Sequence, residues 1–141
     1  MSLNPKYILV AGGLGYIGSH VTVKLLQSGY HVLIADNLSN STIEVIDQIK
    51  QVLNKENITI RSEQLIFKLT DLTVKSEVLD LFEQYHIEGV IAMAGLKAVG
   101  ESVKFPTRYY QTNLNIITNL LEVMNTHNCF KLIFSSSSTV Y

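Results

Sequence analysis

The sequence predicts an α/β fold, a doubly wound parallel sheet of five strands in the order 3-2-1-4-5. Short apolar runs alternate along the chain with segments of helical apolar spacing, which indicates strand–helix–strand units and parallel strands. Hydrophobic residues make up 47% of the 141 residues and charged residues 16%, a balance typical of one domain with a buried sheet. Right-handed crossovers between the strands then set their order.

Five apolar runs are the expected strands. They are Tyr7–Val10, His31–Ala35, Leu65–Leu69, Val90–Met93 and Leu132–Phe134. The segment Ile58–Ile60 competes for the third place, because its alternation of Ile, Thr and Ile is typical of a half-buried strand.

Four helices are expected between and beside these strands. The first carries Ile17, Val21 and Leu25 and stops at Gly29, a residue typical of helix C-caps. The second begins at Ser41–Glu44, which has the spacing of a capping box. The apolar positions of the other two are Val74, Val78, Leu81, Phe82 and Tyr85 for the third, and Tyr110, Leu114, Ile117, Leu121 and Met124, on one face, for a long helix over Pro106–Asn125.

A glycine-rich turn follows the first strand and opens the first helix. It contains Gly13-x-Gly15-x-x-Gly18 and also Gly12-x-x-Gly15-x-x-Gly18. In dinucleotide-binding folds such glycines permit a tight turn, close approach of the backbone to a pyrophosphate, and close helix packing. Asp36 ends the second strand 18 residues after Gly18, the place of the carboxylate that takes a ribose diol. No arginine follows to receive a 2′-phosphate, which favours NAD over NADP.

The carboxyl ends of the other strands carry further candidates, because these ends meet at one edge of the sheet. Asp71 could accept a hydrogen bond from an adenine amino group or could begin a turn. Lys97 could place a cation near the diphosphate or be a solvated loop residue. The serines Ser135–Ser138 and Thr139 offer donors and acceptors, or are simply a polar loop. Turn and helix-cap chemistry explains Asn37–Ser41 equally well.

Four segments together resemble the UDP-glucose 4-epimerase family of the extended short-chain dehydrogenase/reductases: AGGLGYIGSH, DNLSNS, AGLKAVGES and FSSSSTVY. The resemblance implies a Rossmann-like fold, NAD as cofactor, a UDP-sugar substrate, a homodimer, and reversible oxidation of C4 of the sugar through a 4-keto sugar. It assigns Ser137 to the reacting sugar hydroxyl. The cofactor-binding residues that it implies are Gly12, Gly13, Gly15, Tyr16, Ile17, Gly18, Asp36, Asn37, Asn40, Ser41, Asp71, Leu72, Ala94, Gly95, Lys97 and Ser135.

The base of that family is a tyrosine followed four residues later by a lysine, and none of the seven tyrosines here has this spacing. Residues 1–141 are therefore expected to be a truncated, incomplete dinucleotide-binding domain, without the sugar-nucleotide-binding domain and inactive alone. Two alternatives stay open: part of a sister sugar-nucleotide dehydratase or decarboxylase, and a non-catalytic dinucleotide-binding module. Ile116 stands where the family tends to have glycine, which puts the packing of that helix in doubt.

Composition excludes several partner classes. The net charge of −1 argues against nucleic-acid binding, and no apolar run is long enough to span a membrane. The four histidines lack metal-ligand spacing, so no metal site is expected. The single cysteine, Cys129, between apolar neighbours, suggests a buried thiol in the reducing cytoplasm. The fifth strand is expected to be an exposed edge, which favours self-association.

Overall fold

Five parallel strands form one sheet in the computed structural model, which describes residues 4–137. The order is β3-β2-β1-β4-β5, as the sequence predicted. The strands are β1 (Lys6–Ala11), β2 (His31–Asp36), β3 (Leu65–Leu69), β4 (His86–Ala92) and β5 (Leu132–Phe134). Because all five are parallel, their carboxyl ends lie at one edge, where the predicted site residues follow.

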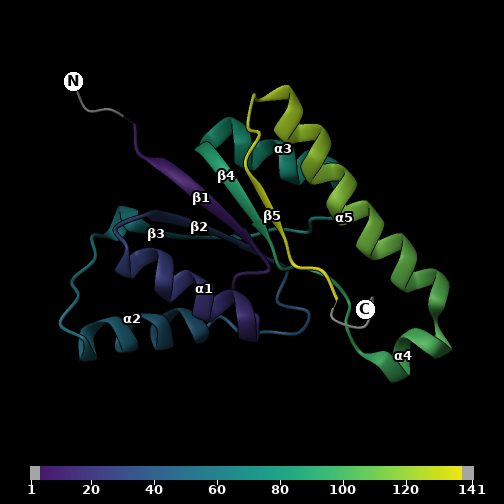
Figure 1. Ribbon diagram of the computed structural model, residues 1–141, viewed down its shortest axis with the longest axis horizontal. Coiled ribbons are helices and arrows are strands. Elements are labelled where there is room, and N and C mark those ends of the chain that lie inside the picture. Colours follow the sequence, from purple (N-terminus) through teal and green to yellow (C-terminus); the bar gives the residue numbers. More distant parts are fainter. Residues whose placement is uncertain (1–3, 138–141) are drawn as a thin grey trace.

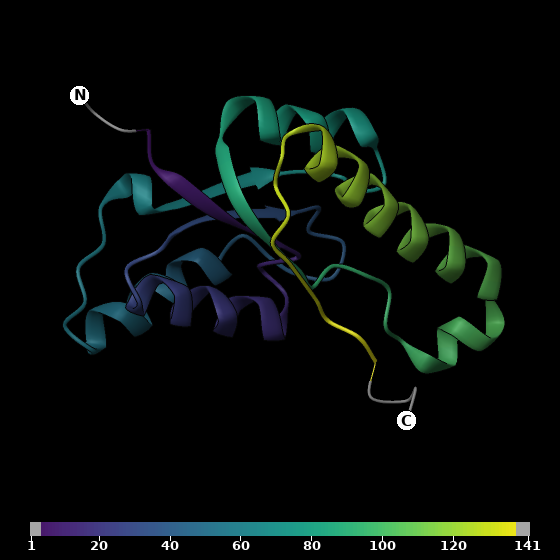
Figure 2. The ribbon, with the colours of Figure 1, turned by 45° about the horizontal axis from the view of Figure 1, so that its top comes forward.

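Helices cover both faces of this sheet (Figures 1 and 2). One face carries α1 (Tyr16–Gln27) and α2 (Val45–Lys55), and the other carries α3 (Lys75–Gln84) and α5 (Pro106–Thr126). A short helix, α4 (Val99–Lys104), stands beyond the sheet at the start of α5, and a 3-10 turn, Ser62–Gln64, precedes β3. No helix within residues 4–137 has the length and apolarity needed to cross a membrane.

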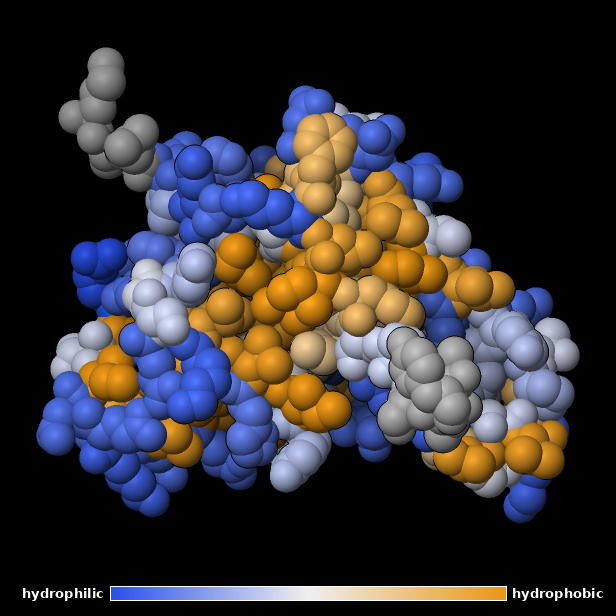
Figure 3. All heavy atoms as spheres, in the orientation of Figure 1, coloured by the Kyte–Doolittle hydropathy of each residue, from blue (hydrophilic) through white to orange (hydrophobic). Residues whose placement is uncertain are grey.

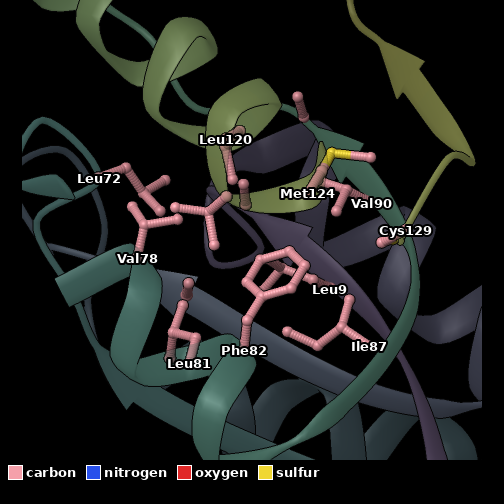
Figure 4. Close-up of a cluster of buried hydrophobic side chains, with 14 of the residues drawn as sticks. Leu9, Leu72, Val78, Leu81, Phe82, Ile87, Val90, Leu120, Met124 and Cys129 are labelled. Atoms are coloured by element: carbon pink, nitrogen blue, oxygen red, sulfur yellow. The ribbon is translucent and has the colours of Figure 1, made fainter. Parts of the chain in front are cut away.

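Two apolar clusters fill the space between the sheet and its helices. Side chains alternate along each strand, so Leu9 and Ala11 face α3 and α5 whereas Val10 faces α1 and α2. Figure 4 shows the larger cluster, in which Phe82 of α3 and Leu120 of α5 pack over the strands. Cys129 is buried there, as expected, and burial raises the pKa of its thiol.

The buried face of α5 differs from the predicted one. Tyr110, Leu114 and Leu121 are exposed, and of the five predicted residues only Met124 is fully buried. The residues buried against the sheet are instead Tyr109, Ile116, Leu120, Val123 and Met124. The helix carries two apolar stripes of the same period, and periodicity alone does not tell which one faces the core. Ile116 packs into the core cluster.

Three other local predictions were wrong. The capping box at Ser41 does not form, and α2 begins at Val45 after Glu44 without a side-chain cap. Residues 99–104, expected as loop, form α4. Residues 58–60 are not a strand; Ile58 and Ile60 pack half-buried against the α1–α2 cluster. The third strand has the bounds that the sequence predicted.

The edge at β5 is exposed, as expected. Ile133 and Phe134 are 61% and 57% exposed, and Figure 3 shows apolar side chains gathered over β5 and the adjoining sheet. Leu114 and Tyr110 of α5 add to the apolar surface of the molecule. An uncovered area of this kind is typical of a surface that packs against another protein segment.

Thr22 offers a test of the packing between α1 and the sheet. It is fully buried, and its Oγ1 has no hydrogen-bond partner among the described residues. We expect Thr22→Val to raise the free energy of unfolding by about 1 kcal/mol, because it removes an unpaired buried hydroxyl. Urea titration measures this. Thr118→Val is the matched control: its hydroxyl is exposed and donates to the Leu114 carbonyl at 2.8 Å, so no gain is expected. A Thr22→Val protein no more stable than the parent would contradict the packing.

Candidate functional site

The loops that follow the five strands meet at the carboxyl edge of the sheet. Backbone hydrogen bonds extend the strand pairing into them: Gly12 N–H donates to the Ala35 carbonyl at 2.7 Å and Met93 N–H to the Ala11 carbonyl at 2.8 Å. Ser135 N–H likewise donates to the Ala92 carbonyl at 3.1 Å. The predicted site residues thus lie on neighbouring loops of one rigid edge, the usual place of a ligand in this fold.

Two of the glycines are required by close backbone packing. Gly12 has a φ of +78°, and a Cβ there would lie 2.7 Å from the backbone of Ala94. A Cβ at Gly18 would lie 2.2 Å from the Gly12 carbonyl oxygen. Gly12 therefore makes the tight turn and Gly18 allows α1 to approach β1, two of the roles that the motif predicts.

Gly15 differs, because nothing in the described chain requires glycine there. Its φ of −68° suits any residue, and a Cβ would meet only the Gly12 carbonyl oxygen, at 3.4 Å. Gly15 is also the N-cap of α1, has no side-chain cap, and is followed by the exposed residues Tyr16 and Ile17. The first backbone N–H groups of α1 and an open space beside Gly15 form a cradle suited to an anionic group.

Asp36 connects three parts of the site. Its Oδ2 accepts the Leu14 N–H of the glycine loop at 3.1 Å. Its Oδ1 accepts the Leu38 N–H at 3.0 Å and the Ser41 hydroxyl at 2.9 Å. Ser41 was interpreted as a helix cap, but its hydroxyl orients this carboxylate instead. Asp36 is only 8% exposed, so the carboxylate is held in one place before any ligand arrives.

The loop after β2 carries backbone strain. Leu38 has a φ of 59°, a left-handed conformation that is rare for a bulky side chain. Asn37 Oδ1 accepts the Ser39 N–H at 3.0 Å, which is the turn interpretation, and Asn40 is exposed. The hydrogen bond from Leu38 to Asp36 offsets the strain and keeps the loop curled toward the glycines.

A groove of about 540 Å³ lies beside this loop and the end of β3. Asn37 and Asp71, which the sequence singled out from separate motifs, both line it. The complete lining is Asn37, Lys68, Leu69, Thr70, Asp71, Glu77, Asp80, Leu81 and Gln84.

Asp71 makes the turn that the sequence allowed for it. Its Oδ1 accepts both the N–H and the hydroxyl of Thr73, at 2.9 and 2.6 Å, and its own N–H donates to Glu77 at 2.6 Å. Leu72 buries its side chain in the core, and its carbonyl accepts the side-chain amide of Asn119 at 3.0 Å. Both bonds with Thr73 use Oδ1, so Oδ2 remains as an acceptor within the described chain.

The loop after β4 is held against the glycine loop and against α5. Ala94 touches Gly12, and the Asn113 side chain binds both main-chain groups of Leu96, accepting its N–H at 2.8 Å and donating to its carbonyl at 3.1 Å. A Cβ at Gly95 would lie 3.1 Å from Asn113 Oδ1. Lys97 is exposed and its Nζ donates to the Met93 carbonyl at 2.9 Å, which keeps the cation at the edge of the sheet.

The serines follow β5 at the same edge. Ser135 is half-buried and Ser136 and Ser137 are exposed. The other predicted members of this loop, Ser138 and Thr139, and the terminal Tyr141 lie outside the described residues. No cluster of three potential metal ligands occurs within residues 4–137.

Sequence reasoning missed Asn113 and Asn119 as site residues. Both lie inside α5, where asparagine is a poor helix former, and both bind main-chain groups of the predicted cofactor loops. A polar residue of low helix propensity between two apolar stripes was the available signal.

The model of the NAD dependent epimerase/dehydratase family matches residues 8–141. The chain is 45% identical over 141 residues to the bifunctional UDP-glucose 4-epimerase and UDP-xylose 4-epimerase 1 of Pisum sativum, covering all of this chain and 39% of that protein. It is 46% identical over 134 residues to the UDP-glucose 4-epimerase of Bacillus subtilis (strain 168), covering 95% of this chain and 37% of that protein.

Solved structures agree. The UDP-glucose 4-epimerase of Bifidobacterium longum, in complex with NAD+ and UDP, superposes with a TM-score of 0.86 at 38% identity, covering 96% of this chain and 38% of that one. The Thermus thermophilus enzyme, in complex with NAD, gives 0.78 at 30% identity, covering 93% and 37%. The chain thus spans less than two fifths of the length of these relatives. With the glycine loop and Asp36 arranged as described, it belongs to the NAD dependent epimerase/dehydratase family and corresponds to the N-terminal, NAD-binding part of the epimerases.

Proposed function

We propose that residues 1–141 form the dinucleotide-binding domain of a UDP-glucose 4-epimerase-like enzyme, with NAD as its cofactor. The observation that carries the proposal is the open cradle at Gly15, where glycine is not needed for packing. The sugar-nucleotide-binding domain belongs to the part of the relatives that this chain does not span. Sister dehydratases or decarboxylases become weaker candidates, because the similar proteins named above are 4-epimerases.

The residues present fit a dinucleotide. The α1 N-terminus and Gly12, Gly13, Gly15 and Gly18 suit a pyrophosphate, and Asp36 suits a ribose diol because its carboxylate is already oriented. When bound, NAD supplies the acceptor for the hydride from C4 of the sugar.

Other residues of the proposal serve the two ends of the dinucleotide. Asn37, Asn40 and Ser41 form the loop beside the adenosine and the diphosphate, and Asp71 and the main chain of Leu72 border the groove on the adenine side. Lys97, beside Ala94 and Gly95, is placed to bring a cation to the nicotinamide side. Ser135 and Ser137 would face the nicotinamide and the sugar hydroxyl. A reducing compartment, the cytoplasm, suits the buried Cys129 thiol.

A pair of alanine substitutions in the glycine loop tests cofactor binding. We expect Gly15→Ala to leave the free energy of unfolding within about 0.5 kcal/mol and to weaken NAD binding about tenfold or more, because its Cβ takes the space of the ligand. Gly18→Ala should lower the free energy of unfolding by about 1–3 kcal/mol, since its Cβ collides with the Gly12 carbonyl. NAD titration and urea unfolding measure the two effects.

Gly89→Ala is the matched control for that pair. Gly89 lies toward the opposite end of β4, and a Cβ there would make ordinary contacts at 3.4 and 3.5 Å. We expect unchanged NAD affinity. If Gly15→Ala binds NAD as tightly as the parent does, the cradle is not the pyrophosphate site.

A chimera tests the catalytic part of the proposal. A polypeptide of these 141 residues should not interconvert UDP-glucose and UDP-galactose, because it holds no tyrosine with a lysine four residues later, and a positioned base contributes about 10²–10⁴-fold. Fused to the remaining part of the Bacillus subtilis epimerase, it should turn over. A coupled assay compares the two proteins. Turnover by the 141 residues alone, surviving repurification, would contradict the assignment of the base.

Self-association is a further proposal, made through the exposed stripe of α5. Tyr110, Leu114 and Leu121 are 70%, 55% and 47% exposed and lie on one helix face. We expect the chain to associate in sedimentation velocity experiments and Leu114→Glu to shift it toward monomer, because burying an unpaired carboxylate is costly. Asn115→Glu adds the same charge at an exposed position of α5 outside this stripe and should leave association unchanged. A monomeric parent across a wide concentration range would exclude this interface.

A further inference from the structure

We propose that Asn119 of α5 is a positioning residue for the adenine end of the site, and that it acts through the main chain of Leu72. The inference rests on the proposed binding of NAD. The residue lies inside a helix, 47 positions along the chain from the loop that it holds.

The contact that carries the proposal joins a helix to a cofactor loop. The Asn119 side-chain amide donates to the Leu72 carbonyl at 3.0 Å, and the pair is partly buried. Leu72 buries its side chain among residues of α3 and α5, so the loop is anchored at its apolar end. The hydrogen bond fixes the rotation of the main chain between Asp71 and Leu72, which an apolar contact alone does not do.

The orientation of Asp71 depends on that main chain. The Asp71 N–H donates to Glu77 at 2.6 Å, and Oδ1 is held by the N–H and the hydroxyl of Thr73. These bonds fix the carboxylate relative to its own loop, whereas Asn119 fixes the loop relative to the rest of the site. An acceptor on Asp71 Oδ2 meets a ligand amino group only when both conditions hold.

A second asparagine of α5 provides the internal comparison. Asn113 holds Leu96 in the loop after β4 through two hydrogen bonds, at 2.8 and 3.1 Å. The two asparagines are six residues apart and therefore roughly 9 Å apart along the helix axis. Each holds a different loop, so the loss of Asn119 should affect the purine end alone, whereas the loss of Asn113 should not affect purine selectivity.

The test compares two dinucleotides that differ at one purine substituent. Nicotinamide hypoxanthine dinucleotide carries a carbonyl oxygen in place of the adenine amino group. The parent should bind NAD about tenfold more tightly than this analogue, because Asp71 accepts a hydrogen bond from the amino group and repels the carbonyl. In Asn119→Ala we expect the ratio to fall below about threefold, with the affinity for NAD reduced accordingly.

The controls separate positioning from general damage. Asn113→Ala should weaken both dinucleotides and keep the parent ratio, and Asn115→Ala, at an exposed position of α5, should change neither. Thermal unfolding of each variant reports whether it is folded. Asn119→Leu, which keeps the bulk and removes the donor, should reproduce the loss of selectivity if Asn119→Ala is unstable.

The outcomes are distinguishable. A collapse of the ratio in the Asn119 variants alone supports the proposal. An unchanged ratio in folded Asn119 variants overturns it. A parent that binds both dinucleotides equally also overturns it while leaving NAD binding intact, whereas a parent that binds neither overturns the proposed function and the inference together.

Discussion

The glycine loop brings three backbone segments together with no room for a side chain between them, and the geometry of the site depends on this contact. The Gly12 carbonyl lies where a Cβ of Gly18 would be, 2.2 Å away, and a Cβ of Gly12 would lie 2.7 Å from the Ala94 backbone. α1 therefore starts directly at the end of β1, with its N-terminus at the carboxyl edge of the sheet. The loop after β4 is brought to the same point. A side chain at either glycine would separate two elements that must both reach one ligand.

Asp36 shows how the site is organised before a ligand binds. Its carboxylate takes donors from the glycine loop, from Leu38 and from Ser41, so two loops share one acceptor. Fixing these groups in the folded protein removes an entropic cost that binding would otherwise bear. The same three bonds mean that Asp36 is both a structural and a binding residue. Gly15, where the fold makes no demand, separates the two roles more cleanly than Asp36 does.

The strands and their order followed from the sequence because buried parallel strands read as continuous apolar runs and crossovers have one hand. The local details were harder, for reasons that are visible in the contacts. The helix cap expected at Ser41 was displaced by a tertiary bond to Asp36, which local spacing does not reveal. The wrong stripe of α5 was chosen because Leu114 and Leu120 are equally apolar, and only the sheet decides which is buried. The site residues were reached mostly through motifs and resemblance. Asn113 and Asn119 belong to no motif that was recognised, and only the contacts reveal them.

α5 links the uncovered surface to the cofactor loops. Leu114, on the exposed stripe, directly follows Asn113, which holds the loop after β4, and Asn119 holds the loop after β3 from another flank of the helix. A helix moves largely as a unit, because each turn is bonded to the next. Any segment that packs on the stripe and shifts α5 therefore displaces both asparagines together. By linkage, a partner that favours the position of α5 seen here strengthens dinucleotide binding, and the dinucleotide strengthens the partner's binding by the same factor. The polar residues of α5 make this coupling possible, since its apolar contacts alone would permit the helix to slide without moving the loops.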